Sequence, residues 1–266
     1  MKKKWKRSIS TGSGVIFCLL IYLFLFLPIF VIVVNSFNAT TSKPYLSWKG
    51  FTFQWYLKLF ENEELLQSFY TTMTVAIVSM MIAVAVGTIA AVGMYRHKFK
   101  GKNIIDGLLY IPVVIPEIVL GISMLTIFAK AGVPRGMITL VLAHATFSIP
   151  FVVFNVRARL SDYDNSVEEA SMDLGANRIK TFFHITVPVL APGIFGGALM
   201  AFTLSIDDVI ISYFTNGQVK TFPLKVMDSI KSGVSPDINA LSTLILLATT
   251  ILVMATQSGV FHKNKQ

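Results

Sequence analysis

Three carboxylic acids, Glu117, Asp207 and Asp208, lie in stretches of the chain that are otherwise apolar. An ionisable side chain at membrane depth carries a high free-energy cost, so it is a functional hypothesis by default. The Lys and Arg residues of the surrounding sequence fall in connecting segments rather than beside these acids. We therefore expect the three carboxylates to receive a cationic solute.

The positions of these acids along their helices favour a shared depth. Glu117 lies about 14 residues beyond the predicted start of its helix, which is roughly 20 Å at 1.5 Å per residue. Asp207 lies at a similar spacing after Gly193, where the next acid-bearing helix leaves a proline-rich entrance. Neighbouring residues on a helix point about 100° apart, so Asp207 and Asp208 do not both face one lumen squarely. A neighbouring helix or the loop backbone is the alternative partner of one of them.

Other interpretations of the polar residues stay open. The two aspartates are also compatible with an external helix end, and Glu117 with a neutral contact between helices. Tyr110 and Tyr213 offer ring faces that attract an organic cation, although packing or an interfacial position is the commoner role of tyrosine. We leave His144 and Asn155 out of the site, because a lone histidine among apolar residues usually hydrogen-bonds a neighbouring helix.

A second candidate region is the polar segment 158–186, which is too long for a simple turn between helices. Ser166 and Glu169 have the spacing of a capping box, which predicts a short helix that starts at Ser166. Gly175 supplies a residue that adopts positive φ after the helix, and Asn177 predicts the cap of a second helix. The second helix would carry an apolar face made of Ile179, Phe182, Phe183 and Ile185.

These features of segment 158–186 have two physical interpretations. A rigid surface with an apolar face is suited to dock a partner protein. An amphipathic helix can equally lie on the lipid surface. The residues by themselves leave both interpretations open.

The composition indicates which elements position these groups. Of the 266 residues, 54% are hydrophobic and 14% are charged, whereas soluble domains average about 25% charged residues. The mean hydropathy is +0.66. The single cysteine, Cys18, excludes a disulfide within the chain and a structural zinc site. Lipid is therefore the expected solvent of an all-α membrane protein.

Apolar windows predict six transmembrane helices. They lie near residues 14–34, 69–95, 104–129, 136–157, 187–214 and 239–261. The first is too long for the apolar part of a signal peptide and is expected to stay as an anchor.

The distribution of charge predicts the orientation of these helices. Most of the 23 Lys and Arg residues fall on one side if both termini are cytoplasmic, as the positive-inside rule requires. The net charge of +9 then reflects topology and anionic lipid rather than binding to nucleic acid.

Segment 158–186 also carries a recognisable motif. It reads Glu169-Ala170-Ser171, three residues, Gly175, nine residues, Ile185, one residue, Val187-Pro188. This resembles the EAA loop of ABC importer permeases, with Ser171 and Val187 as departures from the usual Ala and Leu. The resemblance implies that the loop docks in a cytoplasmic ATPase subunit, with Glu169, Ala170, Ser171, Gly175, Ile185 and Pro188 as coupling residues.

A wider resemblance covers nearly the whole chain. The stretches 202–209, 222–225 and 233–241, together with Pro116-Glu117, are similar to permeases of the PotC type, which belong to spermidine/putrescine importers. This resemblance implies a type I ABC importer permease fold and a pathway for polyamines. Residues 1–35 would form the N-terminal cytoplasmic tail and first transmembrane helix, residues 66–257 the permease core, and residues 158–186 the coupling loop.

The same resemblance implies a set of partners in the bacterial plasma membrane. These are a PotB-like second permease, two PotA-like ATPase subunits and an external PotD-like polyamine-binding protein. No G-x-x-x-x-G-K-[ST] phosphate loop occurs in the chain, so ATP and Mg are expected in the ATPase subunits and no cofactor or catalytic activity in this chain. A permease for another cationic or small solute, such as iron or an amino acid, is the alternative, followed by an ion-coupled secondary transporter.

Overall fold

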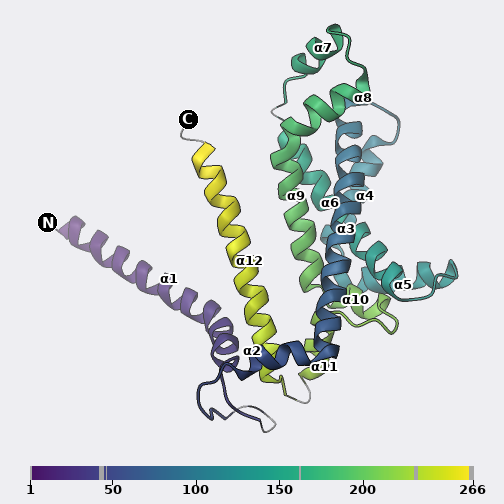
Figure 1. Ribbon diagram of the computed structural model, residues 1–266. Helices are drawn as coiled ribbons and strands as arrows, with labels where there is room; N and C mark the ends of the chain where they lie inside the picture. The colour runs from purple at the N-terminus through teal and green to yellow at the C-terminus, as the bar shows by residue number, and fades with distance from the viewer. Residues whose placement is uncertain (1, 42–44, 46, 162, 231–232, 264–266) are drawn as a thin grey trace. The chain divides into compact units, whose positions relative to one another are not determined.

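The computed structural model describes residues 2–41, 45, 47–161, 163–230 and 233–263 (Figure 1). These residues form helices and one isolated β-bridge, between Asn38 and Phe51, so the all-α prediction is confirmed for the described part of the chain. The chain divides into two compact units, one made of residues 67–227 and the other of residues 1–66 and 228–266. Each unit is described by itself.

The core of the first unit lies where three long helices pack along their lengths. These are α3 (Glu63–Arg96), α6 (Met137–Leu160) and α9 (Val187–Asp207). Glycines bring their backbones close: a Cβ added at Gly87 would lie 2.8 Å from the Cβ of Val152, and one at Gly197 would lie 3.0 Å from the Cα of Val152. Small residues of this kind let helices approach closely in lipid, where dispersion contacts rather than water drive packing.

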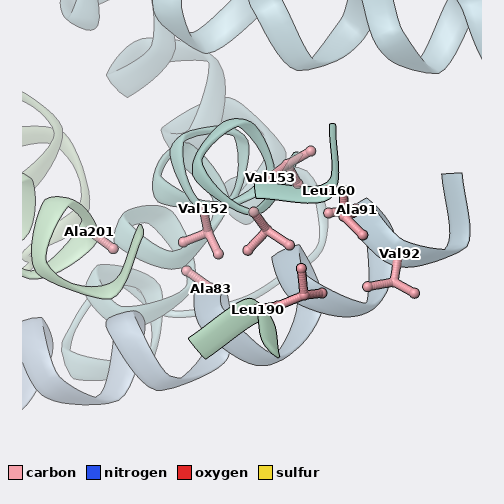
Figure 2. Close-up of a cluster of buried hydrophobic side chains, with 9 residues drawn as sticks. Ala83, Ala91, Val92, Val152, Val153, Leu160, Leu190 and Ala201 are labelled. Atoms are coloured by element: carbon pink, nitrogen blue, oxygen red, sulfur yellow. The ribbon is translucent and has the colours of Figure 1, made fainter. Parts of the chain in front are cut away.

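Small and branched side chains fill the space between these helices (Figure 2). None of the side chains that form this cluster exposes more than 4% of its surface. The packed cluster fixes the positions of α3, α6 and α9, to which the remaining elements of the unit attach. It consists of Ala83, Ala91, Val92, Val152, Val153, Val156, Leu160, Leu190 and Ala201.

The helix predicted at 104–129 is interrupted. It consists of α4 (Lys102–Val114) and α5 (Glu117–Lys130), which meet at an angle of 113°. Ile115 and Pro116 are both extended, with ψ of 137° and 135°. A proline disfavours helical backbone in the residue before it, so the break falls directly ahead of Pro116.

The helix predicted at 187–214 is also interrupted. It ends as α9 at Asp207, Asp208 is extended with ψ of 126°, and the short helix α10 (Ile210–Thr215) follows. Both interruptions lie at the acids singled out from the sequence.

The segment between α6 and α9 forms the two short helices that the sequence predicts. They are α7 (Ser166–Asp173) and α8 (Arg178–Thr181), and the π-helical turn η2 (Phe182–Thr186) leads from α8 into α9. Gly175 has φ of +88°, and the Asn177 side chain accepts a hydrogen bond from the backbone N–H of Lys180 at 2.8 Å, so both predictions are confirmed.

The predicted capping box of α7 is wrong. Asn165 occupies the N-cap position, without a capping hydrogen bond from its side chain. The backbone N–H of Ser166 donates instead to Oδ1 of Asp164 at 2.9 Å. The backbone N–H of Glu169 donates to the Asn165 carbonyl at 3.2 Å, so neither of the two predicted bonds between Ser166 and Glu169 forms.

The second unit holds α1 (Lys2–Asn35), α2 (Gln54–Lys58), η1 (Leu59–Glu61) and α12 (Pro236–Lys263), while α11 (Phe222–Ser229) spans the boundary between units.

Asn38 organises the segment after α1. Its side chain donates to the Ser47 carbonyl and accepts from the Lys49 N–H. Its backbone carbonyl accepts from Trp55 Nε1 at 2.6 Å. Asn62 donates to Asp237 at 2.8 Å, which ties η1 to the start of α12.

The number of membrane spans follows from helix length and apolar character. Among the described residues, four uninterrupted helices are long and apolar enough to cross a membrane: 14–35, 63–96, 137–160 and 178–207. The bent pair α4–α5 makes a fifth span if it counts as one. The apolar stretch found in α12 is shorter, Pro236–Ile251, so the sixth span stays a prediction.

Candidate functional site

The three acids lie at the two helix breaks. Glu117 is the first residue of α5, Asp207 is the last residue of α9, and Asp208 lies between α9 and α10. The structure brings them together, since Glu117 lies within electrostatic range of both Asp207 and Asp208. Glu117 and Asp207 are exposed, whereas Asp208 retains only 7% of its accessible surface.

Close packing of α5 on α10 holds the two breaks side by side. A Cβ added at Gly121 would lie 2.6 Å from Cδ2 of Phe214 and 3.5 Å from the Ile210 carbonyl oxygen. Met124 of α5 and Ile211 of α10 belong to one buried cluster. The glycine therefore permits the contact that places Glu117 near the aspartates.

Asp208 lies two residues before the first residue of the short helix α10 and caps that helix with its side chain. Its carboxylate accepts hydrogen bonds from the backbone N–H groups of Ile211 at 3.2 Å and Ser212 at 2.7 Å. A carboxylate suits this place because the first N–H groups of a helix have no partner within the helix and carry partial positive charge. One of the two adjacent aspartates thus bonds the backbone, which is the alternative that helix geometry left open.

Behind Asp208 lies a buried polar network centred on His144. The Nδ1 of His144 lies 2.6 Å from the Ser205 hydroxyl, and its Nε2 lies 3.0 Å from the Ser212 hydroxyl and 3.3 Å from Oδ2 of Asp208. Ser205 in turn lies 3.3 Å from the hydroxyl of Ser79. His144 therefore connects α6 with α9 and α10, and through Ser205 with α3, as expected of a lone histidine among apolar residues.

The two tyrosines are more than half exposed. Tyr110 of α4 exposes 54% of its surface and lies against Phe154 of α6, with ring centroids 4.9 Å apart. Tyr213 of α10 exposes 57% and meets Phe214 edge to face at 5.4 Å. Tyr213 lies on α10, the helix that Asp208 caps, whereas Tyr110 lies about two helical turns before the break at Pro116. A cation–π role for either ring stays a prediction.

The residues of the EAA-like motif form an accessible surface. Glu169, Ala170 and Gly175 are exposed, and Pro188 lies in the first turn of α9. A groove of about 440 Å³ separates α7 from the α8–α9 connection, and Leu174 at its rim exposes 91% of its surface. The groove is lined by Val167, Ala170, Ser171, Leu174, Gly175, Ala176, Lys180 and Ile185.

Sequence reasoning missed Glu168, the neighbour of Glu169. Glu168 retains 8% of its accessible surface and forms an ion pair with Arg96 at the end of α3. The sequence offered only a weak indication that Glu168 faces inward. Glu168 lies three residues before the partly buried Ser171, so the two share a face of α7. Which of two adjacent glutamates points inward depends on how α7 is oriented against α3.

Several known proteins are similar to this chain in sequence. The family described as "Binding-protein-dependent transport system inner membrane component" matches residues 83–262. The spermidine/putrescine transport system permease protein PotC of Haemophilus influenzae is 37% identical, over 91% of this chain and 93% of that protein. PotC of Escherichia coli is 39% identical, over 92% of each chain. The putrescine transport system permease protein PotI of Escherichia coli is 39% identical, over 90% of this chain and 87% of that protein.

Two solved structures share the fold. One is a bacterial ABC transporter involved in the import of the acidic polysaccharide alginate, with a TM-score of 0.69, 13% identity, and coverage of 92% of this chain and 95% of that chain. The other is the MetNI methionine ABC transporter in inward-facing conformations, with a TM-score of 0.59, 16% identity, and coverage of 74% and 94%. At these identities the likeness shows the fold alone, which is that of an ABC importer permease.

Proposed function

The chain belongs to the family of binding-protein-dependent transport system inner membrane components, and on that premise we propose that it forms half of a polyamine pathway in an ATP-driven importer. It is a multi-pass protein of the inner membrane. Both termini are cytoplasmic in the proposed orientation, which places segment 158–186 on the cytoplasmic side. Relatives at 37% and 39% identity that are named for spermidine and putrescine transport support the choice of substrate.

The observation that carries the proposal is the cluster of acids at the two helix breaks. Glu117 and Asp207 are exposed, and neither forms an ion pair among the residues that the structure describes. A carboxylate forms strong charge-assisted hydrogen bonds with an ammonium group. Glu117 and Asp207 would receive ammonium groups directly, and the buried Asp208 would add negative charge from behind.

The proposed energy source is a separate ATPase. Its subunits, two PotA-like copies, would bind ATP and Mg and would dock on the surface formed by Glu169, Ala170, Ser171, Gly175, Ile185 and Pro188. A PotB-like permease would complete the pathway, and a PotD-like protein would deliver the polyamine from outside. This chain would act as a transport subunit without catalytic residues of its own, with residues 66–257 as its permease core.

Uptake of labelled putrescine and spermidine by cells that carry all four components tests the proposal. We expect Glu117→Gln and Asp207→Asn each to reduce uptake while the complex still assembles. The matched control is Asp106→Asn, which removes an acid from α4 that pairs with Arg157 of α6, away from the two breaks. Full uptake in both test variants would remove these acids from the pathway, and an absence of polyamine uptake by the unmodified complex would favour another solute.

A further inference from the structure

Four side chains join three elements at the loop end of the helix core. Arg96 is the last residue of α3, Glu168 lies in α7, Thr186 ends the turn η2 ahead of α9, and Tyr163 precedes α7. We call these four residues the Arg96 junction. Arg96 and Glu168 are 72 positions apart in the sequence, so the junction connects α7 directly with a helix that is distant along the chain.

Three hydrogen-bond donors in the junction converge on one carboxylate oxygen. Oε1 of Glu168 accepts from the Thr186 hydroxyl at 2.6 Å, from the Tyr163 hydroxyl at 2.8 Å and from the Arg96 guanidinium. The same guanidinium nitrogen of Arg96 donates to Oγ1 of Thr186 at 2.9 Å. The three elements therefore share a closed set of hydrogen bonds.

Burial and charge make this set resistant to rearrangement. Thr186 is fully buried, and Glu168 retains 8% of its accessible surface. Burial raises the pKa of Glu168, but hydrogen bonds from Thr186, Tyr163 and Arg96 outweigh burial and lower that pKa below its ordinary value. Burial and the hydrogen bond to Glu168 raise the pKa of Tyr163 to about 12. Removing one partner of a buried charge leaves the other without compensation, which is costly.

Residues outside any helix border α7 on both sides. Tyr163 and Asp164 precede it, and the bend with φ of +88° at Gly175 follows it. Such segments absorb changes in φ and ψ more readily than a helix does, so they transmit displacement poorly. The side-chain link through Glu168 bypasses them.

We propose that Glu168 is a positioning residue for coupling: the Arg96 junction makes α7, the end of α3 and the start of α9 move as one body when the ATPase displaces the loop. The inference rests on the proposed docking of the loop. Glu169 faces outward and is free to meet the ATPase, whereas Glu168 faces inward and holds the loop to the membrane helices. Two adjacent glutamates thus have different tasks.

The first test is the number of polyamine molecules taken up per ATP hydrolysed by the complete transporter in proteoliposomes. Glu168→Gln removes the charge, and Thr186→Val removes the bridging hydroxyl with little change of shape. We expect uptake per ATP to fall by about fivefold or more in each, the lower end of typical coupling between sites. Asp106→Asn, which removes an ion pair between α4 and α6 whose acid is more exposed than Glu168, is expected to leave the ratio unchanged.

A distance measurement tests the same inference independently of the substrate. Spin labels are attached through Asp173→Cys in α7 and Lys98→Cys after α3, both exposed positions. Cys18→Ala first removes the only native thiol of this chain, and the chain is labelled before it is assembled with the other subunits. In the otherwise unmodified transporter, we expect one narrow distance distribution that is the same without nucleotide and with ADP trapped by vanadate after ATP hydrolysis. In Glu168→Gln and Thr186→Val, the distribution should broaden or shift between the two states.

The outcomes separate this inference from the proposed substrate. An altered distance in the unmodified transporter, or unchanged distances and unchanged uptake per ATP in both junction variants, would overturn the inference. An equal loss in Asp106→Asn would also overturn it. If Glu168→Gln does not assemble, Thr186→Val decides. If the unmodified transporter takes up no polyamine while the distances depend on Glu168, the substrate assignment fails and the junction stands.

Discussion

Replacing His144 by Leu is expected to destabilise the helix core measurably. Leucine has a similar volume but removes three interactions, with Ser205, Ser212 and Asp208, all of them buried. Interhelical hydrogen bonds in membrane proteins contribute about 0.6 kcal/mol each on average, which gives a loss of about 2 kcal/mol for the three. The loss is larger if the Asp208 carboxylate stays buried with fewer donors.

Thermal unfolding of the transporter purified in detergent measures this loss. A change of about 1 kcal/mol shifts the melting temperature by roughly 2–4 °C in a chain of 150–250 residues, so His144→Leu should lower it by about 4–8 °C. Thr146→Val is the matched control, because Thr146 is exposed on the same helix and its hydroxyl donates to the carbonyl of Leu142 in that helix. We expect little change in the control.

A double-mutant cycle locates the effect in the network. Ser205→Ala alone should also destabilise the protein, and Ser205→Ala with His144→Leu should cost less than the sum of the two, because both remove the same 2.6 Å contact. Strict additivity, or a melting temperature for His144→Leu equal to that of the Thr146→Val control, would refute the assignment of His144 as the link between α6, α9 and α10.

Three further predictions concern packing, backbone conformation and pH. Gly87→Ala should destabilise the protein by about 1–3 kcal/mol, because the added methyl overpacks against Val152. The control Gly93→Ala on the same helix adds a methyl to open space, so it should be neutral or stabilising in the same melting assay. Gly175→Ala should destabilise the folded coupling loop by about 1–2 kcal/mol, because an alanine is strained at the positive φ of this position. It should therefore reduce ATP-driven uptake more than the control Gly107→Ala in α4, where the added methyl meets open space. Burial raises the pKa of Glu168, but its hydrogen-bond donors outweigh burial and lower that pKa below the ordinary 4.5. The ionised Glu168 therefore stabilises the fold fully above pH 4.5, and this stabilisation disappears as the pH falls through the lowered pKa. The melting temperature should therefore fall more steeply below pH 4.5 in the unmodified transporter than in Glu168→Gln, and parallel pH profiles would contradict this.

Local patterns in the sequence predict the coupling loop well, because backbone chemistry determines its shape. Gly175 adopts positive φ and Asn177 caps α8 for reasons that depend only on neighbouring residues. The capping box at Ser166 failed because Asp164, two residues earlier, offers a carboxylate to the same backbone N–H. Competition between nearby acceptors is not resolved by the spacing of a motif.

The helix breaks show what hydropathy does not predict. A window of apolar residues is equally apolar whether the helix is straight or bent, so the segments 104–129 and 187–214 each read as one span. Pro116 was a signal for the first break, since the preceding residue avoids helical backbone. The break at Asp208 depends on tertiary contacts, because His144 and the first turn of α10 stabilise the carboxylate there.

For the three acids, too, the sequence predicts some features, whereas others depend on how the helices pack. Their place in otherwise apolar stretches was readable from the sequence, and helix geometry predicted that Asp207 and Asp208 point in different directions. Which of them is buried followed only from the packing of α5, α6, α9 and α10. The inward orientation of Glu168, next to the exposed Glu169, has the same origin.

The most direct test of the central claim is ATP-dependent uptake of labelled spermidine and putrescine into proteoliposomes that hold the complete transporter with its binding protein. The unmodified transporter and the Glu117→Gln, Asp207→Asn double variant are compared at equal amounts of assembled complex. The account predicts uptake by the unmodified transporter and its loss in the double variant. Equal uptake by the two would contradict a carboxylate-lined path for polyamines through this chain.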